Sequence, residues 1–282
     1  MSIFNSFNEL KPTINSLNKT ILKRGQKTVK STFIKISQLY YNLAGNKVEC
    51  NICHYKADRF KSNPWHLYTN CPQCGSSIRS RLLVAALAFL DKFKEEKLIA
   101  GKKVLHCAPE EAIKQVVAKK ASVYKTGDYL AEGYDYGNID YNLDITDMKQ
   151  IADESFDCLI ACDVLEHVYN LNNGLTEIYR VLDHGGYCIL TVPQKDHLDK
   201  TYEDLTITDS KERERLFGQD DHMRIFGDDF VPMLESAGFK VTAVDEKFFD
   251  KAIIEKHVLF PPVLSKHPLA TNYRKVYFGK KV

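Results

Sequence analysis

The sequence lacks the features that mark membrane proteins, secreted proteins and strongly basic nucleic-acid-binding proteins. No run approaches the roughly 18 apolar residues of a membrane span, and the N-terminus has no continuous apolar core of a signal peptide. Over 282 residues the net charge is only +2, so the chain as a whole does not attract polyanions strongly. No internal repeat or low-complexity tract is present. With 44% hydrophobic and 27% charged residues, we expect a globular, cytoplasmic enzyme.

The first 46 residues are basic, with six Lys and one Arg against one Glu. Apolar side chains such as Ile14, Leu17 and Ile21 recur there at helical spacing beside Lys19. The pattern predicts a helical leader over residues 1–46. In one interpretation, the apolar stripe of this helix docks on the rest of the protein or, through self-association, on a second subunit. In the other, the basic helix contacts an anionic membrane or a nucleic acid.

Four of the eight cysteines form two C-x-x-C pairs, separated by 17 residues: Cys50, Cys53, Cys71 and Cys74. This spacing predicts that four thiolates bind one tetrahedral ion, and we expect structural Zn²⁺, with iron in a rubredoxin-like site as the alternative. A zinc ribbon is therefore expected over residues 47–76. Its role is either structural or the docking of a nucleic acid or glycan. The other four cysteines lie singly in apolar runs, which indicates buried thiols and no disulfide framework.

After a linking helix expected over residues 77–100, strands and helices alternate. Apolar segments predict seven strands, at residues 102–108, 121–128, 141–145, 155–162, 185–193, 239–245 and 273–279. Amphipathic segments predict helices at residues 110–120, 175–182 and 228–238. Repeated β–α units predict an α/β domain over residues 101–282, with a doubly wound, mostly parallel sheet covered on both faces.

Residues 155–193 read SFDCLIACDVLEHVYNLNNGLTEIYRVLDHGGYCILTVP. This segment combines an apolar strand, a Glu–His pair, an amphipathic helix and a Gly–Gly turn before the next strand. In this order the features resemble the core of class I methyltransferases that depend on S-adenosylmethionine (SAM), of the methyltransferase type 11-like kind. The resemblance covers roughly residues 101–282. It implies a seven-stranded, Rossmann-like methyltransferase fold and SAM as cofactor.

The resemblance also implies which residues bind SAM. Asp128, at the end of the second strand, is expected to accept hydrogen bonds from both ribose hydroxyls. Asp144 is expected to accept from the adenine amino group, with Asp147 as the alternative, and Ile145 to present its backbone. The ends of the first and fourth strands are expected to approach the cofactor through Cys107, Ala108, Glu110 and Cys162. The first loop departs from the family's glycine pattern, since Pro109 has no N–H. Either Glu110 binds the SAM amino group there, or the chain is a non-catalytic relative.

Asp163, Glu166 and His167 follow the fourth strand and are expected to open the next helix. Their i, i+3, i+4 spacing would place them on one helix face beside the methyl donor. There they could deprotonate a substrate hydroxyl. The same triplet resembles the metal-binding element of ubiquinone-pathway O-methyltransferases, in which a divalent ion polarises the hydroxyl. The structural alternative is two acids at a helix N-terminus and a packed histidine.

An insertion over residues 193–228 is expected to form a lid or substrate loop, because long insertions at this edge of a sheet commonly bind ligands. Its charged middle is too polar for the core. His222 is a second candidate base there, and Arg224 a candidate ligand for an anionic or sugar hydroxyl group. The two residues resemble an H-x-R-x-aromatic stretch of related bacterial methyltransferases. The alternative is a solvated charged loop.

Together these features predict O-methylation of a small molecule or glycan precursor. An RNA methyltransferase that grips RNA with the ribbon and basic leader is one alternative, although residues 162–167 lack the Asn/Asp-Pro-Pro-aromatic element that holds a flipped base. A non-catalytic module that binds SAM and zinc is the other.

Overall fold

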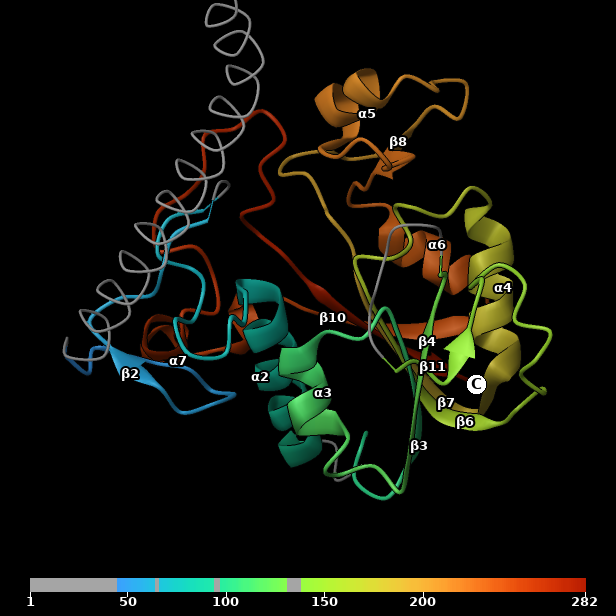
Figure 1. Cartoon of the computed structure of the whole chain (residues 1–282), viewed down its shortest axis with the longest axis horizontal. Coiled ribbons are helices and arrows are strands. Elements are labelled where there is room, and N and C mark those ends of the chain that lie inside the picture. The colour runs from blue at the N-terminus through green and yellow to red at the C-terminus, as the bar shows by residue number, and fades with distance from the viewer. Residues whose placement is uncertain (1–44, 64–65, 94–96, 131–137) are drawn as a thin grey trace, which may run out of the picture.

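The computed structural model describes residues 45–63, 66–93, 97–130 and 138–282 (Figure 1). The leader expected over residues 1–46 lies outside these ranges except for its last two residues, so its helix and its self-association stay predictions. Within the described ranges, no helix is both long enough and apolar enough to cross a membrane.

A seven-stranded sheet forms the centre of the structure (Figure 1). Its strands are β3 (Lys103–Cys107), β4 (Val123–Asp128), β5 (Tyr141–Asn142), β6 (Phe156–Cys162), β7 (Leu182–Thr191), β10 (Phe239–Val244) and β11 (Val276–Lys281). Their order is β10-β11-β7-β6-β3-β4-β5, and β11 alone runs antiparallel to its neighbours. The expected doubly wound, mostly parallel sheet is confirmed.

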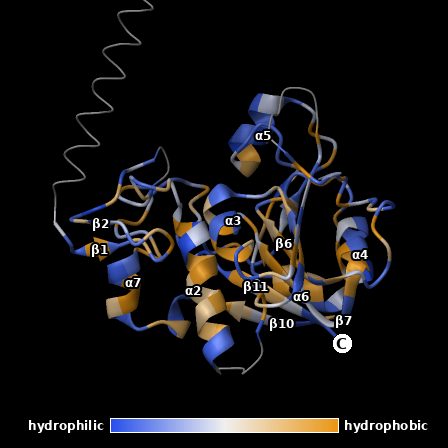
Figure 2. Cartoon of the chain, turned by 60° about the horizontal axis from the view of Figure 1, so that its bottom comes forward, coloured by the Kyte–Doolittle hydropathy of each residue, from blue (hydrophilic) through white to orange (hydrophobic). Residues whose placement is uncertain are grey.

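Helices cover both faces of this sheet. They are α2 (Ile78–Phe93), α3 (Glu111–Val117), α4 (Leu171–Val181) and α6 (Phe230–Ser236). Helices α4 and α6 pack on one face with Leu105 and Leu159, and α2 and α3 pack on the other with Val104 and Ile160. Because successive side chains of a strand point to opposite faces, central strands need apolar residues at consecutive positions. Figure 2 shows hydrophobic residues gathered on the strands and on the helix surfaces facing them.

The helix expected to begin at Asp163 is wrong. Helix α4 begins at Leu171, and the Asn170 side chain caps it by accepting from the Asn173 N–H at 3.1 Å. Asp163 has a positive φ of 51°, in the left-handed region, so the chain turns sharply there and cannot enter a helix directly. Asp163, Glu166 and His167 therefore lie on a connecting turn rather than on one helix face.

The cysteine segment forms a small unit that packs beside the sheet domain. It contains the antiparallel strands β1 (Val48–Glu49) and β2 (Lys56–Ala57). This unit contacts α7 (Lys251–His257), a charged helix that the sequence pattern did not predict. Helix α7 follows the short 3₁₀ helix η1 (Glu246–Phe248). The buried guanidinium of Arg81 in α2 joins these parts by donating to the carbonyls of Thr69 at 2.7 Å, Ser76 at 2.6 Å and Val258 at 2.9 Å.

The insertion over residues 193–228 lies beyond the ends of the central strands, where Figure 1 shows it above the sheet. It contains β8 (Tyr202–Glu203), α5 (Ser210–Phe217) and β9 (Arg224–Ile225). Half of the residues of α5 are exposed, as expected for its charge. The last part of the insertion is buried, as His222, Arg224 and Phe226 show. Phe217 and Phe226 are buried and anchor the insertion, while much of the charged segment between residues 203 and 215 is exposed.

Candidate functional site

A cavity of about 650 Å³ opens at the carboxyl ends of β3, β4 and β6. Parallel strands end on the same edge of a sheet, and open α/β sheets bind ligands there. The volume lies within the range of about 300–1,000 Å³ that small-molecule sites occupy. The segments that follow β3, β4, β5 and β6 line this cavity. Among their residues are Cys107, Ala108, Asp128, Asp144, Ile145, Asp163 and His167. We call it the cofactor cavity.

Asp128 ends β4 at the wall of this cavity. Its Oδ1 accepts from the Tyr129 N–H at 2.8 Å, while its Oδ2 is buried and has no hydrogen-bond partner among the described residues. Burial raises the pKa of this carboxyl, against the lowering effect of the Tyr129 hydrogen bond. Buried oxygens nearly always have a donor, so Oδ2 is suited to a ligand hydroxyl. The preceding residue must be Gly127, since a Cβ there would lie 2.7 Å from Cδ2 of Leu143.

The loop after β3 has few free amides. Ala108 has a positive φ of 46° and donates its N–H to the Gly127 carbonyl at 2.8 Å, and Pro109 has no N–H. Glu110 does not line the cofactor cavity. Its carboxylate accepts from Ser80 Oγ at 2.9 Å and pairs with Arg79 Nη2 at 2.8 Å. The geometry therefore directs Glu110 toward α2.

Two of the remaining predicted cofactor residues line the cavity and one does not. Asp144 is exposed, and its Oδ1 accepts from the N–H and hydroxyl of Thr146 at 2.8 and 2.7 Å, which fixes a tight turn. Ile145 beside it is buried. Cys162 is also buried, but it packs in the apolar layer under α2 rather than at the cavity wall. Burial raises the pKa of its thiol.

Asp163 is bound on all sides. Its carboxylate accepts from Arg274 Nη1 at 2.8 and 2.9 Å and from the Thr191 hydroxyl at 2.8 Å, and it pairs with Arg79. Burial alone would raise the pKa of Asp163, but the two guanidinium groups outweigh it and hold the pKa well below its usual range. Asp163 is thus a permanent anion that positions two arginines, and it is too weakly basic to accept a substrate proton.

Glu166, His167 and His222 form a cluster whose ligand atoms all lie within 4.8 Å of one another. Glu166 is 1% exposed, and its Oε1 lies 3.9 Å from Nε2 of each histidine. Burial, and next the charge of Asp163, raise the pKa of Glu166. His167 pairs through Nδ1 with Asp221 at 3.1 Å. The two rings meet edge to face at 4.7 Å. The sequence did not predict that His167 and His222 would meet.

The hydrogen bond of His222 determines which ring nitrogen carries its proton. Nδ1 lies 2.9 Å from the Phe217 carbonyl, so Nδ1 is the N–H and Nε2 of the neutral ring holds a lone pair. This Nε2 is buried and has no hydrogen-bond partner among the described residues. Burial lowers the pKa of His222, which keeps the ring neutral near pH 7.

Arg224 does not line the cofactor cavity. Its guanidinium donates to the carbonyls of Leu165 at 2.6 Å and Val168 at 2.5 Å, and it pairs with Glu203. These contacts tie the insertion to the turn that carries Glu166 and His167. The donors of Arg224 are therefore directed at protein groups, and the residue holds the insertion in position against this turn.

A second cavity, of about 280 Å³, lies beside the first. His222 and Phe217 of the insertion line it, together with Arg79 of α2 and Arg274 near the C-terminus. Asp163 lines both cavities. We call this the acceptor cavity. Neither arginine was predicted as a site residue, because each reaches the cavity only through the tertiary fold.

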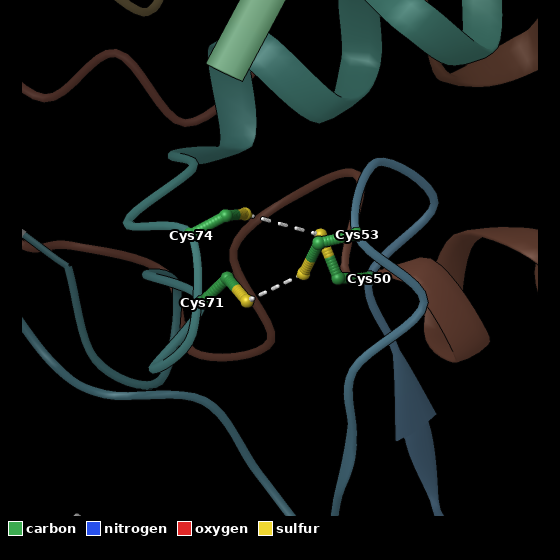
Figure 3. Close-up of side chains that lie close together, drawn as sticks. All are labelled: Cys50, Cys53, Cys71 and Cys74. Carbon is green, nitrogen blue, oxygen red and sulfur yellow. Dashed lines mark hydrogen bonds between the residues drawn. The ribbon is translucent and has the colours of Figure 1, made fainter. Parts of the chain in front are cut away.

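The four paired cysteines meet in the small unit beside the sheet, as Figure 3 shows. The Sγ atoms of Cys50 and Cys74 lie 3.7 Å apart, and those of Cys53 and Cys71 lie 3.6 Å apart. A tetrahedron with Zn–S bonds of about 2.3 Å has edges of about 3.8 Å. These separations are compatible with zinc binding and far too long for disulfides.

Comparison with known proteins agrees with this architecture. Residues 100–190 match the family model for the methyltransferase domain. The chain is similar to a SAM-dependent methyltransferase from Mesorhizobium loti, with 13% identity over 71% of this chain and 100% of that chain and a TM-score of 0.46. It is also similar to 1,6-didemethyltoxoflavin-N1-methyltransferase from Burkholderia thailandensis, with 13% identity over 71% of this chain and 78% of that chain and a TM-score of 0.45. No curated protein matches the sequence significantly.

Residues 100–190 thus contain a methyltransferase domain, which agrees with the class I, SAM-dependent family expected from residues 155–193.

Proposed function

We propose that the protein transfers a methyl group from SAM to a hydroxyl oxygen of a small molecule or glycan precursor, with His222 as general base. One observation carries the proposal. The unpartnered lone pair of His222 Nε2 belongs to a residue that lines the acceptor cavity, and this cavity meets the cofactor cavity at Asp163. A base must lie within reach of the proton it removes, at the place where acceptor and methyl donor meet.

The residues of the cofactor cavity fit SAM. Asp128 Oδ2 would accept from the ribose hydroxyls, and the turn at Asp144 and Ile145 would contact the adenine. The backbone at Cys107 and Ala108 would face the amino acid end of SAM. When bound, SAM supplies an electrophilic methyl group on a positively charged sulfur. The support for this assignment is the buried, unpartnered Oδ2 at a cavity of suitable volume.

His222 performs the proton step. Its Nε2 accepts the proton of the acceptor hydroxyl, which leaves the oxygen nucleophilic, and the ring becomes positively charged. The nearby carboxylates of Asp221 and Asp163 favour that charged form. The bond from Nδ1 to the Phe217 carbonyl holds the ring orientation throughout. A His222→Asn variant that binds SAM normally but no longer transfers methyl groups would support the assignment, and one with full turnover would overturn it.

The cluster of Glu166, His167 and His222 offers a second mechanism. One carboxylate and two imidazoles form a ligand set for a divalent ion, which would polarise the hydroxyl instead. The sequence predicted Asp163 as a third type of ligand in this metal site, but its carboxylate forms ion pairs with Arg79 and Arg274. A chelator distinguishes the two mechanisms, because only the ion-dependent one loses activity and regains it with added Mg²⁺.

We also propose that Cys50, Cys53, Cys71 and Cys74 bind one Zn²⁺ and that residues 47–76 form a zinc ribbon. The sulfur separations support it, and so does Arg81. This guanidinium is 0% exposed and has no carboxylate partner among the described residues. Burial lowers the pKa of Arg81 to about 10, and the four nearby cysteines act in the opposite direction. Four thiolates around Zn²⁺ carry a net charge of −2, which would offset that of Arg81.

A further inference from the structure

The acceptor cavity is built from segments far apart in the sequence, and one of them belongs to the cysteine unit. Asn63, His66 and Thr69, which lie between the two cysteine pairs, form part of its wall. Residues 77–79, Asp163, the insertion and residues 261–274 form the rest. The cofactor cavity contains no residue of the cysteine unit among those described. The ribbon is therefore placed to affect the acceptor without touching SAM.

Three residues that line the acceptor cavity each have one buried polar atom without a hydrogen-bond partner among the described residues. These atoms are His66 Nδ1 of the ribbon, Arg79 Nε of α2 and His222 Nε2 of the insertion. Buried polar atoms are rarely left unpaired in folded proteins. Three such atoms around one cavity indicate a polar ligand rather than an apolar one.

The chemistry of the three atoms favours hydroxyl groups. Arg79 Nε is always a donor, and His222 Nε2 holds a lone pair. His66 Nδ1 donates or accepts according to its tautomer. A hydroxyl group both donates and accepts, so one type of group satisfies all three positions. Apolar side chains complete the wall, among them Ile78, Phe217 and Leu269, and can pack against the C–H face of a ring.

The loop that carries His66 is held in place by the ribbon. The Asn63 side-chain Nδ2 donates to Asn70 Oδ1 at 2.8 Å, and the Asn63 side-chain Oδ1 accepts from the His66 backbone N–H at 2.7 Å. The Thr69 carbonyl accepts from Arg81, and Cys71 follows two residues later. Folding of the cysteine unit thus fixes the position of His66. Burial, and next the positive charge of Arg274, lower the pKa of His66 and keep its ring neutral.

We propose that Asn63, His66 and Thr69, which lie between the cysteine pairs, are part of the acceptor site, and that the acceptor presents a hydroxyl-rich ring of monosaccharide size to His66, Arg79 and His222. This inference rests on the proposed methyl transfer. The cavity volume of about 280 Å³ holds one such ring rather than a longer chain, whose remainder would extend into solvent. The ribbon then acts in acceptor recognition and is more than a stabilising element.

Saturation-transfer NMR on the full chain with S-adenosylhomocysteine tests the proposal. The probes are methyl glycosides of the common hexoses and 2-methoxytetrahydropyran, which has the same ring without hydroxyls. We expect at least one glycoside to bind and the hydroxyl-free ring not to bind. His66→Ala should weaken glycoside binding about five-fold or more, the scale of one neutral hydrogen bond. His66→Asn, whose amide reaches about the position of Nδ1, should retain most of it.

Affinity for S-adenosylhomocysteine and metal content are measured on the same samples. His66→Ala should change neither, which separates a contact to the acceptor from loss of the ribbon's structure. The acceptor proposal is overturned if no glycoside binds, if the hydroxyl-free ring binds equally well, or if His66→Ala and wild type bind glycosides alike. Failure of the wild-type chain to bind S-adenosylhomocysteine would instead overturn the proposed function itself.

Discussion

Arg79 in the first turn of α2 and Asp163 at the end of β6 form an ion pair, and both residues line the acceptor cavity. Arg79 also pairs with Glu110, and Asp163 also pairs with Arg274. This chain of charges joins α2, the loop after β3 and the C-terminal segment. It brings the helix that leads out of the cysteine unit to the point where the two cavities meet.

Asp163→Asn should lower the free energy of unfolding by about 3 kcal/mol, the lower end of the range for breaking a buried pair, because both arginines are partly exposed. Urea denaturation measures this. The control is Asp153→Asn, which removes an exposed partner of Arg180 and should have little effect. Equal effects of the two variants would contradict the account.

The same carboxylate predicts a pH dependence of stability. Since Arg274 and Arg79 outweigh burial and hold the pKa of Asp163 below its usual value, its stabilisation is present above the unfolded-state pKa of about 3.9. It is lost as the pH falls through the folded-state pKa. Between about pH 5 and pH 3, wild type should lose more stability than Asp163→Asn. Parallel curves for the two proteins would show that Asp163 titrates normally.

Zinc analysis should find one ion per chain. Cys71→Ser should remove it and destabilise residues 48–75, because three thiolates and a hydroxyl bind zinc weakly, while affinity for SAM stays near wild type. Cys158→Ala is the control, since this buried thiol lies in β6 and should leave the metal in place. Elemental analysis and calorimetry check both. Metal-free wild-type protein with an intact ribbon would be incompatible with the proposed site.

His222→Asn should lower turnover by about 10²–10⁴-fold and leave SAM affinity unchanged, since proton removal serves only the acceptor. Burial lowers the pKa of His222, and the base is active when neutral. Activity should therefore persist below the ordinary value of about 6.5 and fall only as the pH drops through the lowered pKa. The control His184→Ala changes an exposed side chain. Loss of activity with a chelator would favour the ion mechanism at Glu166 and His167.

Much of the fold follows from the sequence because apolar runs mark the strands. The predicted segments 102–108, 121–128 and 155–162 contain β3, β4 and β6 within a few residues at each end. The predicted helix start at Asp163 was wrong, because the spacing of Asp163, Glu166 and His167 also suits a turn. The left-handed backbone of Asp163 forms this turn, and the helix begins only after the cap at Asn170. The local sequence pattern alone cannot distinguish a helix start from such a turn.

The site was predictable only in part. Asp128 follows from its position at the end of a strand. Arg224 was read as a ligand contact because its carbonyl partners at Leu165 and Val168 lie more than 50 residues away. His66 and Arg274 showed no local signal, because the segments that carry them meet only when the ribbon and the C-terminal region pack together.

Calorimetric titration with S-adenosylhomocysteine tests the central claim, a SAM site at the carboxyl end of β4, most directly. The account predicts one site per chain in wild type and binding weakened by about 1–3 kcal/mol in Asp128→Ala, the scale for a lost charged hydrogen-bond acceptor. Asp153→Ala, which removes an exposed carboxylate paired with Arg180, should bind like wild type. An absence of binding in wild type, or equal affinities for all three proteins, would contradict the claim.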